Sequence, residues 1–170
     1  MNFLEELAAE WYEYNGHFVR KNIKFGGPAG KSSGGHTGEI DIAAFEPKTS
    51  TLTHIETSAD AYTQEARRIR FVKKFTTASA HYVDLFGFPI KEVKRVVIVG
   101  FSTNQQKFDW RLADGSRIEI KDIPSFILEI SSRLGKLDPV AKAIPESLPL
   151  LRAIQHTAFY LNRRGKSGTK

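Results

Sequence analysis

Gly38-Glu39-Ile40-Asp41-Ile42 and His54-Ile55-Glu56-Thr57-Ser58 are the two stretches of sequence that decide the fold. They belong to runs 39–45 and 51–57, which are separated by the turn-like segment 46–50. The pattern predicts an antiparallel pair of strands. Because side chains alternate along a strand, Glu39 and Asp41 share a face of the first strand, and His54, Glu56 and Ser58 share a face of the second.

If these two faces coincide, the carboxylates of Asp41 and Glu56 converge on one point. Convergent carboxylates repel each other unless a positive group lies between them. A hard divalent cation, Mg²⁺ or Mn²⁺, fits such an oxygen site. The pattern therefore favours a metal site, and the alternative is that both residues are ordinary polar positions on the wet face of a sheet.

The elements on either side of this pair follow from apolar periodicity and turn residues. Helical spacing predicts helices over 2–15, 61–86, 126–134 and 148–162. Strands are predicted over 17–25 and 95–101, with a hairpin over 108–121 that turns at Asp114-Gly115. The expected fold is α/β, a mixed central sheet flanked by helices with a C-terminal hairpin and helices. We expect one domain over 1–162 and a basic flexible tail over 163–170.

Composition bounds the function. The 170 residues contain no Cys, which excludes disulfides and thiolate sites, and no apolar run is long enough to cross a membrane. The acidic start lacks the basic segment of a secretory signal, so a soluble, cytoplasmic protein is expected. The net charge is +6, and 151–170 contains basic residues without any acidic one, which suits a polyanionic partner or a solvated tail equally.

The glycine-rich segment 26–38 resembles a phosphate-binding P-loop only superficially. Three residues separate Gly26 from Gly30 where a P-loop has four, and Ser33-Gly34-Gly35 does not open a helix. Exposed glycines still bring backbone N–H groups close to an anion. We expect Lys31 in this loop to contact nucleic acid.

The order of a helix, three strands, a long basic helix and a strand, with Asp41 and Glu56 on the second and third strands, resembles the PD-(D/E)XK or restriction endonuclease-like superfamily. The resemblance covers roughly residues 2–101. It implies that Asp41 and Glu56 bind Mg²⁺ or Mn²⁺, and that an acidic residue of the first helix assists, for which Glu10 is the best match. One departure is evident, because Ser58 stands where the family has Lys.

The resemblance implies a metal-dependent DNA endonuclease, with Asp41, Glu56, Glu10 and Ser58 as catalytic candidates. A displaced lysine, such as Lys24 or Lys31, is the alternative to Ser58. The basic stripe of the long helix is expected to contact the DNA backbone; it consists of Arg67, Arg70 and Lys74. His54 is either an aid to proton transfer or a packing residue.

Two other functions remain open. One is a catalytically inactive nuclease-fold domain that binds nucleic acid or a protein. The other is a protein-interaction module with Phe101, Phe108 and Trp110 at its interface. The resemblance also implies a homodimer, although the sequence shows no dimer seam.

Overall fold

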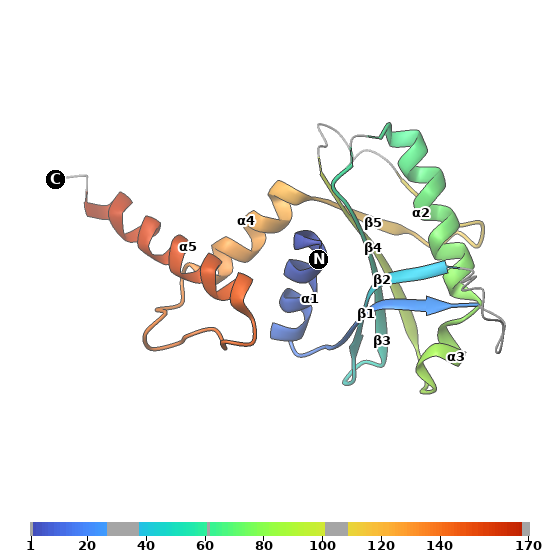
Figure 1. Cartoon of the computed structure of the whole chain (residues 1–170), viewed down its shortest axis with the longest axis horizontal. Coiled ribbons are helices and arrows are strands. Elements are labelled where there is room, and N and C mark those ends of the chain that lie inside the picture. Colours follow the sequence, from blue (N-terminus) through green and yellow to red (C-terminus); the bar gives the residue numbers. More distant parts are fainter. Residues whose placement is uncertain (1, 27–37, 61, 101–108, 168–170) are drawn as a thin grey trace.

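The computed structural model describes residues 2–26, 38–60, 62–100 and 109–167. In chain order the helices and strands are α1 (Phe3–Tyr14), β1 (Phe18–Phe25), β2 (Gly38–Glu46), β3 (Thr51–Ser58), α2 (Gln64–Ser79), α3 (Tyr82–Phe86), β4 (Glu92–Val99), β5 (Ile118–Asp122), α4 (Ile123–Leu134) and α5 (Pro149–Ser167). The expected α/β class, a mixed sheet flanked by helices, is confirmed (Figure 1).

The sheet has five strands in the order β1-β2-β3-β4-β5. β2 is antiparallel to both of its neighbours, β1 and β3, whereas β3, β4 and β5 run parallel. The predicted antiparallel pair is β2 and β3, in a register that sets Ile42 opposite Ile55. Every residue of β3 is buried because the strand lies in the middle of the sheet and is covered on both faces.

The C-terminal hairpin prediction is only partly confirmed. The turn forms at Asp114-Gly115, where Gly115 has φ +83°, and the backbone N–H of Ile118 donates to the carbonyl of Trp110. Within 109–122, however, the two arms share one isolated bridge, and β5 pairs with β4. Pairing with the buried strand β4 brings Ile118 into the core, which a free hairpin does not achieve.

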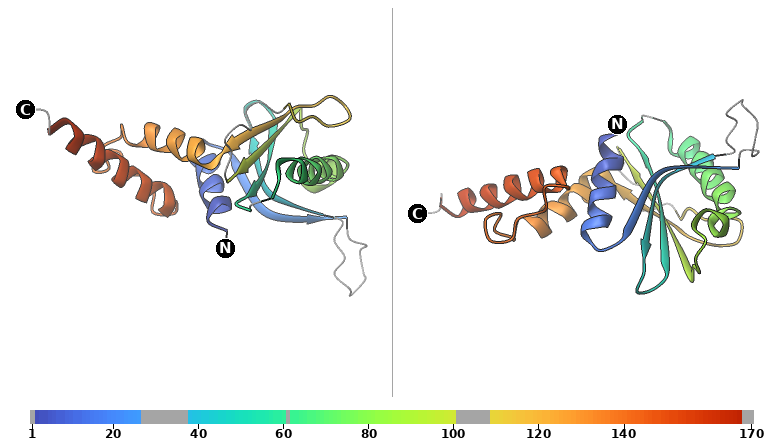
Figure 2. Two further views of the ribbon diagram at one scale, coloured as in Figure 1. Left: turned by 90° about the horizontal axis from the view of Figure 1, so that it is seen from above. Right: turned by 60° about the horizontal axis from the view of Figure 1, so that its bottom comes forward.

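Helices cover the two faces of the sheet separately (Figure 2). α1, α4 and the start of α5 pack on one face through a cluster that includes Leu7, Ile55, Ile130 and Leu151. α2 and α3 lie on the other face, where Phe75 of α2 belongs to a cluster with Val97, and Tyr82 of α3 to a cluster with Leu52. The face under α2 is the one to which Glu56 and His54 point, because Ile55 between them packs toward α1.

The prediction of one long helix over 61–86 is wrong. α2 ends at Ser79, and α3 begins at Tyr82. The break at Ala80 and His81 redirects the chain so that the Tyr82 ring is buried and its hydroxyl lies 2.7 Å from Nδ1 of His54. The break thus coincides with a buried contact between Tyr82 and His54, which the apolar spacing of the sequence does not reveal.

The last helix extends beyond its predicted end at residue 162 and includes residues up to Ser167. Its first half docks on α1, and the rest projects away from the sheet (Figure 1). The buried amide of Gln155 fastens the preceding connection, because it accepts from Ile144 N and donates to the carbonyls of Leu137 and Lys142. None of the described helices combines the length and apolar character that a bilayer crossing requires.

Candidate functional site

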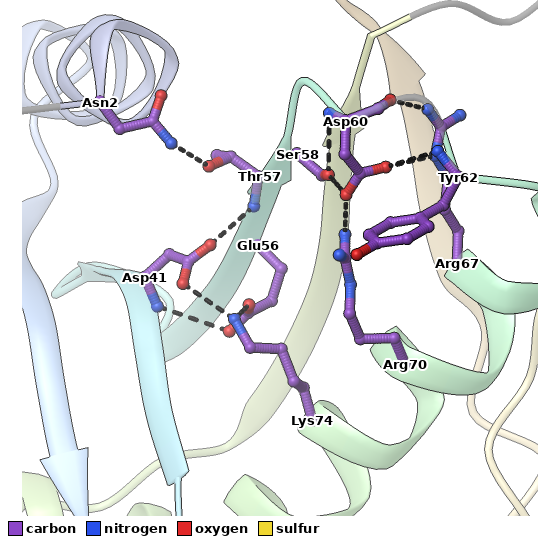
Figure 3. Close-up of polar contacts among 10 residues, drawn as sticks. All are labelled: Asn2, Asp41, Glu56, Thr57, Ser58, Asp60, Tyr62, Arg67, Arg70 and Lys74. Carbon is purple, nitrogen blue, oxygen red and sulfur yellow. Dashed lines mark hydrogen bonds and ion pairs between the residues drawn. The ribbon is translucent and has the colours of Figure 1, made fainter.

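Asp41 and Glu56 do converge, as the alternation of β2 and β3 predicts (Figure 3). The backbone N–H of Asp41 points to Oε1 of Glu56 at 3.4 Å, and the N–H of Thr57 donates to Oδ2 of Asp41 at 2.9 Å. The Glu56 side chain is fully buried and that of Asp41 is 13% exposed. The two backbone donors fix the carboxylates at the end of the sheet, so the pair is preorganised.

The side chain of Lys74 on α2 closes this pair. Its Nζ lies 2.9 Å from Oδ1 of Asp41 and also forms an ion pair with Oε2 of Glu56. The Lys74 side chain is 32% exposed and lines a solvent-open groove. The sequence pattern predicts Lys74 only as a DNA-backbone contact, because helical spacing gives no indication that the third turn of α2 lies over the ends of β2 and β3.

The three charges depend on one another. Burial raises the pKa of Asp41, the neighbouring Glu56 raises it further, and Lys74 opposes both effects. Burial likewise raises the pKa of Glu56 against the influence of Lys74. Burial alone lowers the pKa of Lys74, but the two carboxylates more than compensate and the net shift is upward. A positive charge between the carboxylates therefore favours their ionised forms and opposes the effect of burial.

His54 contacts the Glu56 carboxylate within the core of the protein. Its Nε2 lies 2.7 Å from Oε1 of Glu56, and its Nδ1 lies 2.7 Å from the hydroxyl of Tyr82. Complete burial, reinforced by Lys74, lowers the pKa of His54 to about 3, so the ring is neutral. With Glu56 ionised, Nε2 carries the proton and donates it, and Nδ1 accepts from Tyr82. His54 thus positions the carboxylate, and its buried ring has no access to a reacting group.

A second polar cluster adjoins the carboxylates and is built on Asp60. Ser58 Oγ donates to Oδ2 of Asp60, which also pairs with Arg70 at 2.7 Å, while Arg67 Nε donates to Oδ1 at 3.1 Å. Partial burial opposes ionisation of Asp60, but hydrogen bonds from Ser58, Arg70 and Arg67 lower its pKa to about 2. The hydroxyl of Ser58 is therefore committed to Asp60 and does not replace a cationic side chain.

The three residues of the predicted basic stripe, Arg67, Arg70 and Lys74, differ in their exposure and in their contacts. Arg67 is 3% exposed and is buried against Asp60, so it does not present its charge on the surface as a DNA-binding residue must. Arg70 is 37% exposed and keeps access to solvent, whereas Lys74 turns to the carboxylates. Lys31, the fourth predicted contact, lies outside the described residues.

Glu10 is not at this site. Its buried carboxylate accepts from the backbone N–H groups of Leu150 and Leu151, at 3.2 and 2.9 Å, where α5 begins. An anion at a helix N-terminus satisfies otherwise unpaired donors, so Glu10 anchors α5. The acidic residue of α1 nearest the site is instead Glu5, which is tied to Asn2 by a 2.7 Å hydrogen bond. It was missed because the sequence pattern of the first helix does not indicate which of its acidic residues lies near the ends of β2 and β3.

These residues line an open groove of about 360 Å³. Its walls include Asn2, Glu5, Asp41, Thr57, Ser58, Asp60, Arg70 and Lys74. Among the described residues, no group of three or more His, Asp and Glu side chains is arranged to hold a metal ion. Two carboxylates are nevertheless sufficient for Mg²⁺, which commonly binds one or two of them and completes its shell with water and substrate phosphates. The pair offers oxygen ligands of the type that Mg²⁺ prefers, and in this structure Lys74 contacts Oδ1 of Asp41 and Oε2 of Glu56.

Comparison with known proteins gives the fold and no function. No protein-family model matches the chain, and no curated protein does. The fold is similar to that of a solved protein of unknown function, AF1548, with a TM-score of 0.52 and 17% sequence identity over 90% of this chain and 78% of that one. At this identity the likeness extends to the fold alone.

Proposed function

We propose that this protein is a metal-dependent DNA endonuclease of the PD-(D/E)XK type, with the restriction endonuclease-like fold, which hydrolyses phosphodiester bonds at the groove. The observation that carries the proposal is the contact of one lysine with two buried, backbone-fixed carboxylates in a groove open to solvent. Buried carboxylates with shifted pKa values are typical of functional sites, since burial without a role is costly.

In this proposal Asp41 and Glu56 hold Mg²⁺ or Mn²⁺. The bound metal supplies a water molecule of lowered pKa and offsets negative charge on the phosphate. Thr57 and His54 keep the two carboxylates oriented through the contacts described above. Lys74 lines the groove beside both carboxylates, and its ammonium group would be the cation that contacts the phosphate oxygens.

In this proposal Lys74 has the role that the family assigns to a lysine two residues after the second acidic residue, which is to supply a positive charge at the carboxylates. Ser58 occupies that position here and bonds to Asp60. Lys74 brings its charge to the carboxylates from α2 instead of from β3. The cation is thus retained although its place in the sequence differs, which supports an active site over a degenerate one.

A second function is favoured by the same contact. Because Lys74 already offsets part of the negative charge of Asp41 and Glu56, the carboxylates have a cation partner without a metal, as in a nuclease-fold domain that binds nucleic acid without cutting it. Such a domain binds DNA in a salt-sensitive manner. It binds equally well with and without Mg²⁺, whereas an endonuclease cleaves only with it.

Cleavage of labelled DNA separates the two functions. Wild type, Asp41→Asn, Lys74→Met and the control Lys73→Met are incubated with Mg²⁺, Mn²⁺ or a chelator. Lys73 is exposed on the same helix, so its substitution removes one charge without touching the carboxylates. We expect Lys74→Met to lower the rate by about 10²- to 10³-fold, as loss of a transition-state charge donor does. Asp41→Asn abolishes metal-dependent cleavage, and Lys73→Met retains it.

Relocation of the lysine provides a sharper test. Ser58→Lys combined with Lys74→Met returns an ammonium group to β3, on the face that carries Glu56. We expect the double variant to recover part of the activity that Lys74→Met loses. If wild type cleaves DNA with neither metal but still binds it, the nuclease proposal is refuted and the DNA-binding function replaces it.

A further inference from the structure

An exposed tyrosine lies beside the groove and takes no part in the proposed chemistry. The Tyr62 side chain is 62% exposed. Its backbone N–H donates to Oδ1 of Asp60 at 3.2 Å, and its ring centroid lies 5.5 Å from the guanidinium carbon of Arg70 (Figure 3). The backbone hydrogen bond and the contact with Arg70 hold the ring in place, while most of its area is open to water. Such a ring offers an aromatic surface to a ligand.

Arg70 connects this ring to the groove. Its guanidinium pairs with Asp60 at 2.7 Å and lies over the Phe71 ring, 4.7 Å from the centroid. These contacts hold the planar group in place, and the guanidinium has five N–H donors, more than its pairing with Asp60 uses. Arg70 lines the groove one helical turn from Lys74. A second phosphate, next to the one at the carboxylates, can therefore meet Arg70.

We propose that Tyr62 stacks on an unpaired base of the substrate while Arg70 binds the neighbouring phosphate, so that the site accepts single-stranded or forked DNA in preference to duplex. This inference rests on the proposed function and specifies its substrate class. A base within a duplex has both faces covered by its neighbours, whereas an unpaired base presents a free face to an aromatic ring. An aromatic platform beside a positive groove is the usual means of binding single strands without sequence preference.

Equilibrium binding tests this preference without cleavage. Fluorescence anisotropy of labelled single-stranded, forked and duplex oligonucleotides is measured with Ca²⁺ in place of Mg²⁺. We expect Tyr62→Ala to weaken single-strand binding about 5- to 150-fold, the effect of losing one base stack, and Tyr62→Phe to keep affinity within about twofold. Tyr160→Ala is the matched control, because Tyr160 is 49% exposed on α5, on the other side of the sheet (Figure 1).

A loss caused only by loosening of Arg70 must be distinguished from a loss of stacking. Loosening of Arg70 weakens single-strand and duplex binding alike, whereas loss of stacking weakens only the single strand and the fork. A series of oligonucleotides with one abasic position each gives an independent readout. At one position we expect removal of the base to weaken binding to wild type but not to Tyr62→Ala, which is the coupling that direct stacking requires.

Duplex binding as tight as single-strand binding, or Tyr62→Ala binding like wild type, overturns the inference. So does the absence of any abasic position coupled to Tyr62. Failure of the nuclease proposal looks different: DNA is not cleaved with Mg²⁺ or Mn²⁺, although the dependence of binding on Tyr62 persists. If instead DNA is cleaved with metal and Tyr62→Ala cleaves and binds single strands like wild type, only the inference about the substrate is refuted.

Discussion

Lys74→Met should destabilise the metal-free protein because Asp41 and Glu56 lose the cation that they share. Removing one partner of a buried ion pair costs about 3–5 kcal/mol. Lys74 is 32% exposed, so solvent screening reduces this cost to about 2–3 kcal/mol. A change of 1 kcal/mol moves the Tm of a domain of this size by about 2–4 °C, so the expected decrease is about 4–12 °C.

The loss should depend on pH in a direction that the pKa shifts determine. Both carboxylates have folded-state pKa values above their ordinary values, so ionising them costs folding free energy as the pH rises through those raised values. Without Lys74 the values rise further, and protonation at low pH relieves the cost. The pKa of Lys74 is itself raised, so its stabilising effect is complete below the ordinary pKa of lysine and is lost only in the alkaline range.

Thermal unfolding of wild type, Lys74→Met and Lys73→Met, at about pH 7.5 and about pH 5, measures both effects. We expect the deficit of Lys74→Met to be largest at the higher pH, and Lys73→Met to melt with wild type. Added Mg²⁺ should raise the Tm of Lys74→Met more than that of wild type, because the metal replaces the missing charge. Identical melting of Lys74→Met and wild type at both pH values would refute the view that Lys74 stabilises the ionised pair.

Three further predictions concern the carboxylates and their surroundings. As the pH is lowered, Mg²⁺ affinity measured by calorimetry should begin to fall at a higher pH than it does for ordinary carboxylates. The reason is that protons compete with the metal at higher pH when the pKa values of Asp41 and Glu56 are raised. An affinity that stays unchanged until the pH reaches the usual carboxylate pKa range would contradict this. His54→Phe removes the hydrogen-bond donor to Glu56 and should lower Mg²⁺ affinity about 10- to 100-fold, as loss of a residue that orients a metal ligand does, with the fold retained by circular dichroism. Glu10→Gln weakens the attachment of α5 and should cost about 1–2 kcal/mol in urea unfolding without changing DNA cleavage, whereas a cleavage defect in a folded variant would return Glu10 to the active site.

Of the three aromatic residues that the interaction-module hypothesis places at an interface, Trp110 is among the described residues. Trp110 is 2% exposed and stacks with Phe71 in the core under α2, at 6.3 Å between ring centroids. A buried ring does not form an interface. Phe101 and Phe108 lie outside the described residues.

Local patterns in the sequence determined most of the elements and the pairing of β2 with β3. Helical spacing predicted the first helix over 2–15, and α1 does begin after Asn2, whose side chain accepts from the N–H of Leu4. The alternation of side chains predicted that Asp41 and Glu56 share a site, because adjacent antiparallel strands with a short turn leave few registers. These outcomes depend on residues close together in the chain.

Only the tertiary structure decided which charges meet. Lys74 reaches Glu56, and Glu10 reaches Leu151, through the placement of α2 and α5 on opposite faces of the sheet. Charge and helical spacing made Lys74 equivalent to Arg67, and Glu10 preferable to Glu5. A helix can be rotated or shifted against a sheet without changing its own sequence pattern, and the position it takes depends on packing across the whole core. The sequence thus determined the carboxylate pair, and packing determined the cation between them.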